Sequence, residues 1–96
     1  MFEGVIAPIR TRLLAAGVQR LGIFGSVARE EENDASDVDV LVTFRPEART
    51  FDNLFLVGEM LEEVFRRRVD VVTDGAMSPY LAPHIHAEIK YVDLTG

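Results

Sequence analysis

Cysteine is absent from this 96-residue chain, which excludes disulfides and metal sites built on thiolates. A metal site would therefore need oxygen ligands. Long apolar runs are also missing, so the sequence predicts no transmembrane span. The opening residues, MFEGVIAPIR, lack the basic start and apolar stretch of a signal peptide. We therefore expect a cytoplasmic protein that makes no membrane contact.

Positive charge is scarce, because 10 Lys and Arg are set against 16 Asp and Glu, for a net charge of -6. Proteins that bind a phosphate backbone present a basic surface, so direct nucleic-acid binding is not expected. Free nucleotides and other proteins remain possible partners. A homo-oligomer is also possible. The length predicts a single domain over residues 1–96, with a modest core and no second domain for an acceptor.

Apolar spacing and turn residues predict helices that alternate with strands. The expected helices cover residues 2–16, a short segment from Ser26 to Ala28, the stretch from Thr50 to Arg66–Arg68, and a segment opened by Ser78 and Pro79 and interrupted by Pro83. The expected strands are RLGIFG, SDVDVLVTF, VDVVT and an edge strand in KYVDL. The fold class is α/β (α+β), with a small mixed sheet of three or four strands flanked by about four helices.

The third expected helix is amphipathic. Thr50 is predicted to cap it, and its apolar positions keep the helical period. Those positions are Phe51, Leu54, Phe55, Gly58, Leu61 and Phe65.

Asp37 and Asp39 alternate with valines, so they share one face of a strand that otherwise looks buried. At a separation of about 6.5 to 7 Å, two carboxylates repel by about 2.5 kcal/mol at an effective dielectric of about 20. A divalent cation would offset that cost. Asp70 lies on the next expected strand, and neighbouring strands are about 4.8 Å apart, so an Asp70 at matching height would complete a cluster of three carboxylates. Such a cluster suits Mg²⁺, which also takes phosphate oxygens as ligands.

The turn at Gly25 and Ser26 offers an unobstructed backbone, a hydroxyl group and amides that favour anions. Together with the aspartates, this turn predicts a site for a metal-bound triphosphate. Arg29 either meets the phosphates or pairs with a nearby glutamate.

The stretches GSVAR, SDVDVLV and VDVV resemble the minimal nucleotidyltransferases (MNT) of the polymerase-beta-like superfamily, as in HEPN/MNT toxin–antitoxin pairs. The resemblance implies that Asp37, Asp39 and Asp70 are catalytic and bind two Mg²⁺ ions. It also implies that Gly25 and Ser26 hold the triphosphate of ATP. AMP would pass to a hydroxyl acceptor, a tyrosine of a HEPN ribonuclease, with release of pyrophosphate.

One residue departs from the family pattern: Glu30 stands where glycine commonly follows Ala-Arg. A glutamate in place of glycine changes the expected shape of the phosphate-binding turn. This change leaves open a second hypothesis, in which the protein is a binding module that inhibits its partner by covering it and catalyses no reaction. A third, a transferase for a small alcohol such as an antibiotic, is disfavoured because the chain has no second domain to bind it.

Two groups of charged or titratable residues have simpler explanations. Arg66, Arg67 and Arg68 either complement the dipole of the preceding helix or form a nucleic-acid patch, and the first is favoured. His84 and His86 are two residues apart on an expected helix, so they do not face one another. They are expected on the surface rather than at a metal.

Overall fold

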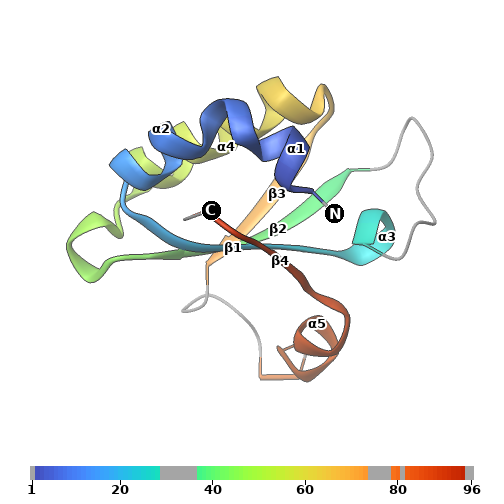
Figure 1. Ribbon diagram of the computed structural model, residues 1–96. Helices are drawn as coiled ribbons and strands as arrows, with labels where there is room; N and C mark the ends of the chain where they lie inside the picture. The colour runs from blue at the N-terminus through green and yellow to red at the C-terminus, as the bar shows by residue number, and fades with distance from the viewer. Residues whose placement is uncertain (1, 29–36, 74–78, 81, 95–96) are drawn as a thin grey trace.

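The computed structural model describes residues 2–28, 37–73, 79–80 and 82–94 (Figure 1). One four-stranded sheet has the order β3-β2-β1-β4. β1 is antiparallel to both of its neighbours, whereas β2 and β3 run parallel, so the sheet is mixed as predicted. The strands are β1 (Val18–Phe24), β2 (Val38–Phe44), β3 (Val69–Thr73) and β4 (Lys90–Val92).

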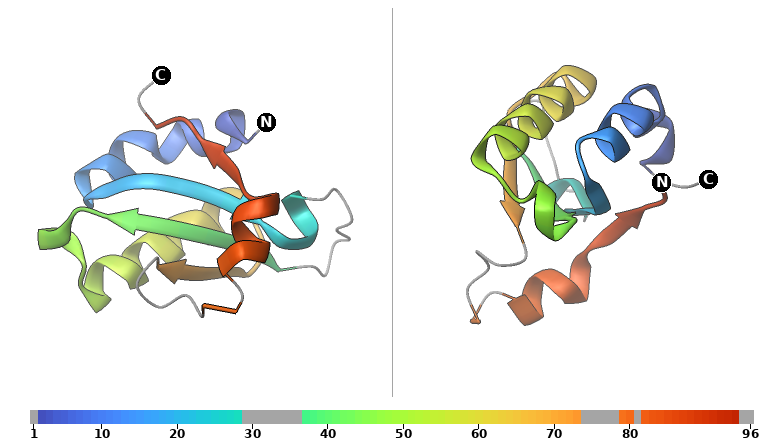
Figure 2. Two further views of the ribbon diagram at one scale, coloured as in Figure 1. Left: turned by 90° about the horizontal axis from the view of Figure 1, so that it is seen from below. Right: turned by 90° about the vertical axis from the view of Figure 1, so that its left-hand side faces the viewer.

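The helices cover the two faces of this sheet unequally. Figures 1 and 2 show α1, α2 and α4 together on one face, with α5 on the other and α3 at the end of β1. No helix among the described residues is long and apolar enough to cross a membrane. The helical segments are α1 (Glu3–Ile6), η1 (Ala7–Ile9), α2 (Arg10–Ala15), α3 (Gly25–Ala28), η2 (Pro46–Ala48), α4 (Phe51–Phe65) and α5 (Ala82–Glu88).

The first helical region has the predicted extent but is not one continuous helix. A 3₁₀ turn with Pro8 near its start separates α1 from α2. Proline has no amide hydrogen and its ring crowds the preceding turn, so the regular hydrogen-bond ladder cannot run through it. Ile6, Ile9 and Leu13 are buried, whereas Val5 is exposed.

The alternation along β2 correctly predicts the core. Val38, Val40, Val42 and Phe44 are all buried and belong to one hydrophobic cluster with residues of β1, α2 and α4. Side chains alternate along a strand, so Asp39, Leu41 and Thr43 lie on the opposite face of the sheet. Leu41 is buried there as well.

The predicted start of α4 is confirmed, but its predicted apolar face is partly wrong. The Thr50 hydroxyl accepts a hydrogen bond from the Asn53 amide at 3.1 Å, as expected for a cap. The residues that α4 buries are Val57, Met60 and Leu61. Phe51 and Phe55 are instead 89% and 70% exposed. β3 is an edge strand, so the sheet does not extend under the side of α4 that carries these two rings.

The last helix begins later than predicted. Pro79 lies in a turn, Ser78 lies outside the described residues, and α5 starts at Ala82. Pro83 is the second residue of α5, where a missing amide hydrogen costs no hydrogen bond, so Pro83 does not interrupt the helix. His84 and His86 are exposed, as expected. β4 pairs only with β1 and confirms the predicted edge strand.

Candidate active site

Two of the predicted aspartates lie side by side at one end of the sheet. Asp39 and Asp70 are register partners on the parallel strands β2 and β3. Side chains of paired residues project from the same face, and neighbouring strands are about 4.8 Å apart. The predicted matching height of Asp70 is therefore confirmed. Asp39 is half-buried and Asp70 is exposed.

Asp37 stands two residues before Asp39, just ahead of β2, and is half-buried. The next residue is held to β3 because the Val38 amide donates to the Arg68 carbonyl oxygen at 2.9 Å. Among the residues that the structure describes, no three acidic or histidine side chains are already gathered closely enough to hold a metal ion. Asp37 precedes this pair in the chain, but its carboxylate does not form a compact three-carboxylate cluster with Asp39 and Asp70.

Gly25 connects β1 to α3 and lies against the Asp39 side chain. Its φ of 77° is in the left-handed region, which glycine adopts without strain. A Cβ atom at this position would overlap the Asp39 carboxylate. Glycine is therefore required here twice, by its backbone angle and by the carboxylate that lies beside it.

A residue that the sequence did not suggest completes this corner. The Gly25 amide donates a hydrogen bond to the Glu88 carboxylate at 3.2 Å, across 63 positions of the chain. Glu88 is the last residue of α5. The next residue, Ile89, packs over Gly22 of β1, where a Cβ would overlap the Ile89 side chain. The missing side chain at Gly22 thus allows the end of α5 to lie on β1 and brings Glu88 to the turn.

The rest of the predicted phosphate-binding turn is described only in part. α3 begins at Gly25, so Ser26 lies inside its first turn and not at the cap, and the Ser26 side chain is outside the described part. Arg29 and Glu30 also lie outside it. Their predicted roles stay predictions.

The residues present fit a hard divalent cation. Asp37, Asp39 and Asp70 supply carboxylate oxygens, which Mg²⁺ prefers, and the Asp39 carboxylate lies against the glycine turn at Gly25. Asp39 and Asp70 repel one another across the two strands, and a cation would remove that repulsion.

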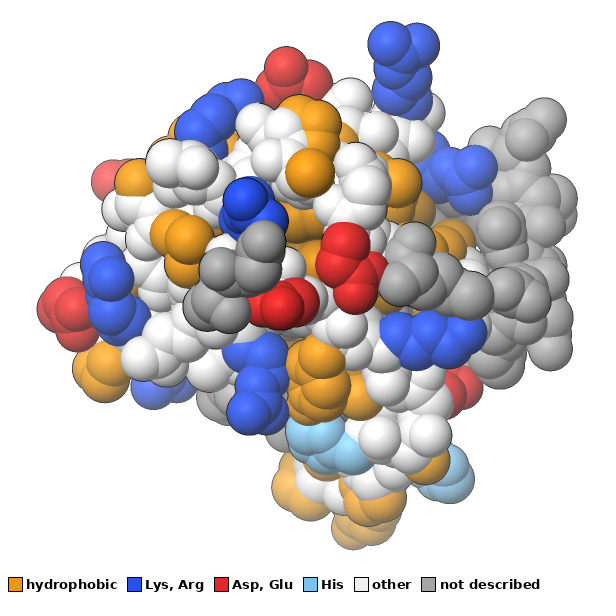
Figure 3. Space-filling model, viewed as in Figure 1, with side chains coloured by type: hydrophobic (Ala, Val, Ile, Leu, Met, Phe, Trp, Pro, Cys, Tyr) orange, Lys and Arg blue, Asp and Glu red, His pale blue; other side chains and the backbone are white. Residues whose placement is uncertain are grey.

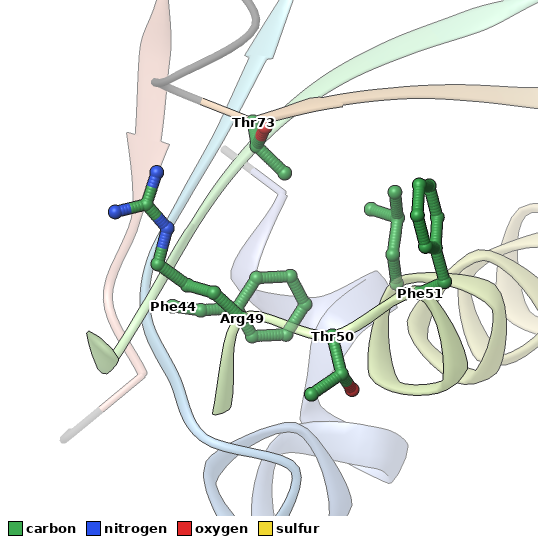
Figure 4. A pocket seen from close by; sticks show the side chains of 6 residues that line it. Phe44, Arg49, Thr50, Phe51 and Thr73 are labelled. Carbon is green, nitrogen blue, oxygen red and sulfur yellow. The ribbon is translucent and has the colours of Figure 1, made fainter. Parts of the chain in front are cut away.

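Figure 3 shows one face of the molecule, on which the described basic and acidic side chains are interspersed. A pocket of about 230 Å³ lies at the opposite end of β2 and β3, and the described residues that line it include no carboxylate (Figure 4). That pocket is separate from the aspartates.

The sequence and the fold are similar to those of known nucleotidyltransferases. The sequence model of the nucleotidyltransferase domain matches residues 6–92. A relative from Methanocaldococcus jannaschii, provisionally named a protein adenylyltransferase, is 42% identical over 73 residues, which cover 76% of this chain and 77% of the relative. The protein adenylyltransferase MntA of Thermococcus cleftensis is 36% identical over 76 residues, 79% of this chain and 76% of its own.

Solved structures show the same fold. One described provisionally as a minimal nucleotidyltransferase has a TM-score of 0.73 and 32% identity, covering 94% of this chain and 95% of its own. A toxin–antitoxin crystal structure with AMP-PNP has a TM-score of 0.68 and 25% identity, covering 100% of this chain and 74% of that one.

Proposed function

We propose that this chain, which belongs to the nucleotidyltransferase domain family, transfers AMP from ATP to a tyrosine hydroxyl of a partner HEPN ribonuclease and so acts as its antitoxin. The observation that carries the proposal is the in-register pair of Asp39 and Asp70 beside Gly25. The similarity to protein adenylyltransferases and to a toxin–antitoxin structure with AMP-PNP supports the choice of ATP and of a protein acceptor.

The three aspartates and the residues of the turn have different roles in the proposed reaction. Asp37, Asp39 and Asp70 would hold two Mg²⁺ ions, and Gly25, Ser26 and Arg29 would bind the triphosphate. Bound Mg²⁺ supplies charge neutralisation of the phosphates and lowers the pKa of a coordinated hydroxyl. The acceptor oxygen forms a bond to the α-phosphorus while the bond to the bridging oxygen breaks. Pyrophosphate leaves, and the hydroxyl proton passes to solvent.

In the proposed reaction the acceptor tyrosine belongs to the partner ribonuclease. An acceptor tyrosine would approach the face that carries Asp39 and Asp70, which is the face opposite α4.

One observation favours a second candidate, a module that masks its partner without chemistry. The Glu88 carboxylate accepts the Gly25 amide hydrogen, so an anion belonging to the chain itself already lies where a phosphate oxygen would bind. If Glu88 stayed there permanently, the triphosphate would be excluded.

Metal and nucleotide should stabilise the fold cooperatively. With ATP and Mg²⁺ at about ten times their dissociation constants, we expect about 1.4 kcal/mol of stabilisation, or about 6 to 10 °C in Tm. Either ligand alone should give a much smaller shift, because each completes the other's site. Differential scanning fluorimetry measures this directly.

Two exposed aspartates provide a matched pair for that experiment. Asp70→Asn should lose most of the joint shift, whereas Asp52→Asn, in the first turn of α4, should keep it. Equal shifts with and without Mg²⁺ at saturating ATP would contradict the metal-dependent proposal.

Glu88 should compete with the triphosphate. Glu88→Gln keeps a side-chain oxygen for the Gly25 amide but removes a negative charge next to the phosphates. The repulsion between the Glu88 carboxylate and the phosphates is about 1 kcal/mol after solvent screening. We therefore expect Glu88→Gln to bind a non-hydrolysable ATP analogue about fivefold more tightly. Isothermal titration calorimetry tests it. Weaker binding to Glu88→Gln would show instead that Glu88 takes part in holding the nucleotide or its metal.

A further inference from the structure

α4 carries two exposed phenylalanines, with half-buried Leu54 and Gly58 on the same side of the helix. We define the α4 stripe as Phe51, Leu54, Phe55 and Gly58, which follow one another along one side of the helix. Phe51 and Phe55 are 89% and 70% exposed. Two large rings exposed one helical turn apart are unusual on a protein that works alone, and such patches mark interaction surfaces.

A hollow lies directly beside the stripe, between α4 and the edge strand β3. It has a volume of about 360 Å³ and is lined by Leu54, Phe55, Gly58, Glu59, Glu62, Val69 and Val71. A Cβ added at Gly58 would meet only the Val71 Cγ2 atom, at the ordinary distance of 3.8 Å. The absent side chain at Gly58 therefore leaves room for an apolar group from outside, and the hollow is large enough for a phenyl ring.

The α4 stripe has the same spacing in both directions along the helix. Positions 51, 54, 55 and 58 are symmetric about a point between Leu54 and Phe55. If two α4 helices pack antiparallel about a two-fold axis at that point, Phe51 lies over Gly58 of the partner subunit, and Leu54 meets Phe55 of the partner subunit. We propose that two copies of this chain form a dimer through their α4 stripes, with each Phe51 ring filling the other's hollow.

Two residues near the ends of the α4 stripe, Arg49 and Glu59, carry opposite charges. Arg49 precedes the helix and Glu59 follows Gly58; both are exposed, and neither has an ion-pair partner among the described residues. They are about 15 Å apart along the axis. An antiparallel pair brings Arg49 near Glu59 of the partner subunit twice, because the interface is isologous. A parallel pair would place like charges together.

The available area suits a dimer. Phe51 also lines the 230 Å³ pocket next to the first turn of α4, and Figure 4 shows Arg49 on the other side of that pocket. An aromatic side chain buries about 150 to 250 Å², so four largely exposed phenylalanines supply about half of the roughly 1,200 Å² that a stable interface needs. The aspartates lie on the sheet face away from α4, so both sites stay open.

Sedimentation velocity of the full chain without nucleotide tests the proposal independently of any transferase activity. We expect a reversible dimer between about 1 and 100 μM. Phe51→Ser should raise its dissociation constant at least about 30-fold, as loss of a hot-spot aromatic does. Gly58→Leu should also prevent dimerisation by filling the hollow, yet raise Tm because leucine favours helix. Tyr80→Ser removes a ring that is 87% exposed outside α4 and should change nothing.

A charge exchange tests the orientation. Arg49→Glu and Glu59→Arg should each weaken the dimer about fivefold, since each acts at two equivalent contacts, and the double variant should restore it. A chain that stays monomeric at every concentration would overturn the proposal, even if Phe51→Ser then weakened binding to a different protein. A dimer indifferent to Phe51→Ser and Gly58→Leu would overturn it as well, and failure of the double variant to recover would exclude the antiparallel arrangement.

Discussion

Asp39→Asn is expected to lower the rate of AMP transfer by about 10²- to 10³-fold, because a metal ligand contributes several kcal/mol of transition-state stabilisation. The same substitution should leave Tm unchanged or raise it by a few degrees. Asn has nearly the volume of Asp, and the change removes one of two carboxylates that are register partners on adjacent strands. Loss of activity with retained stability is the signature of a ligand rather than of a structural aspartate.

Single-turnover transfer assays and thermal unfolding of the same preparations measure both effects. Asp52→Asn, on the exposed start of α4, is the control and should keep wild-type transfer. An Asp39→Asn protein that unfolds would assign Asp39 a structural role, and one that transfers AMP at the wild-type rate would remove Asp39 from the active site.

The face of β2 that carries Asp39 could be predicted from the sequence, because this strand alternates strictly. Four alternate residues of β2 are buried, which fixes the face that carries the aspartates. The pairing with β3 could not be predicted in the same way, because β3 has no strict alternation of buried and exposed residues. The structure pairs Val38 with Val69, and this register aligns Asp39 with Asp70.

Glu88 could not be predicted in this way. Its contact with Gly25 depends on the antiparallel pairing of β1 with β4 and on the packing of Ile89 over Gly22. Neither leaves a periodic signal, and a glutamate at the end of a short helix looks like any solvated residue. Only the assembled sheet brings positions 25 and 88 together.

The buried side of α4 could not be chosen from spacing alone, because two apolar stripes run along the same helix. One includes Val57, Met60 and Leu61, and the other includes Phe51 and Phe55. The position of β3 at the sheet edge decides between them, and that position is a property of the strand order. The wrong prediction is informative, since the stripe left outside is the one we infer to join two copies.

The second large effect concerns the partner. With Mg²⁺ and ATP, we expect this protein to attach AMP to a tyrosine of its cognate ribonuclease, and the modified ribonuclease should stay inactive after the two proteins are separated. Asp39 and Asp70 are on the sheet face opposite α4, and Asp70 is exposed there, so we expect an acceptor from another chain to approach from that side. A masking module would differ in both respects, because inhibition by masking ends when the complex dissociates and does not depend on Asp37 or Asp39.

The most direct test is therefore the intact mass of the ribonuclease, separated from this protein after incubation with Mg²⁺ and ATP. We predict a mass increase of one AMP per modified tyrosine, persistent loss of ribonuclease activity, and neither effect with the Asp37→Asn, Asp39→Asn double variant. An unmodified ribonuclease that regains full activity on separation, and is inhibited equally by the double variant while bound, would contradict the transferase and support masking.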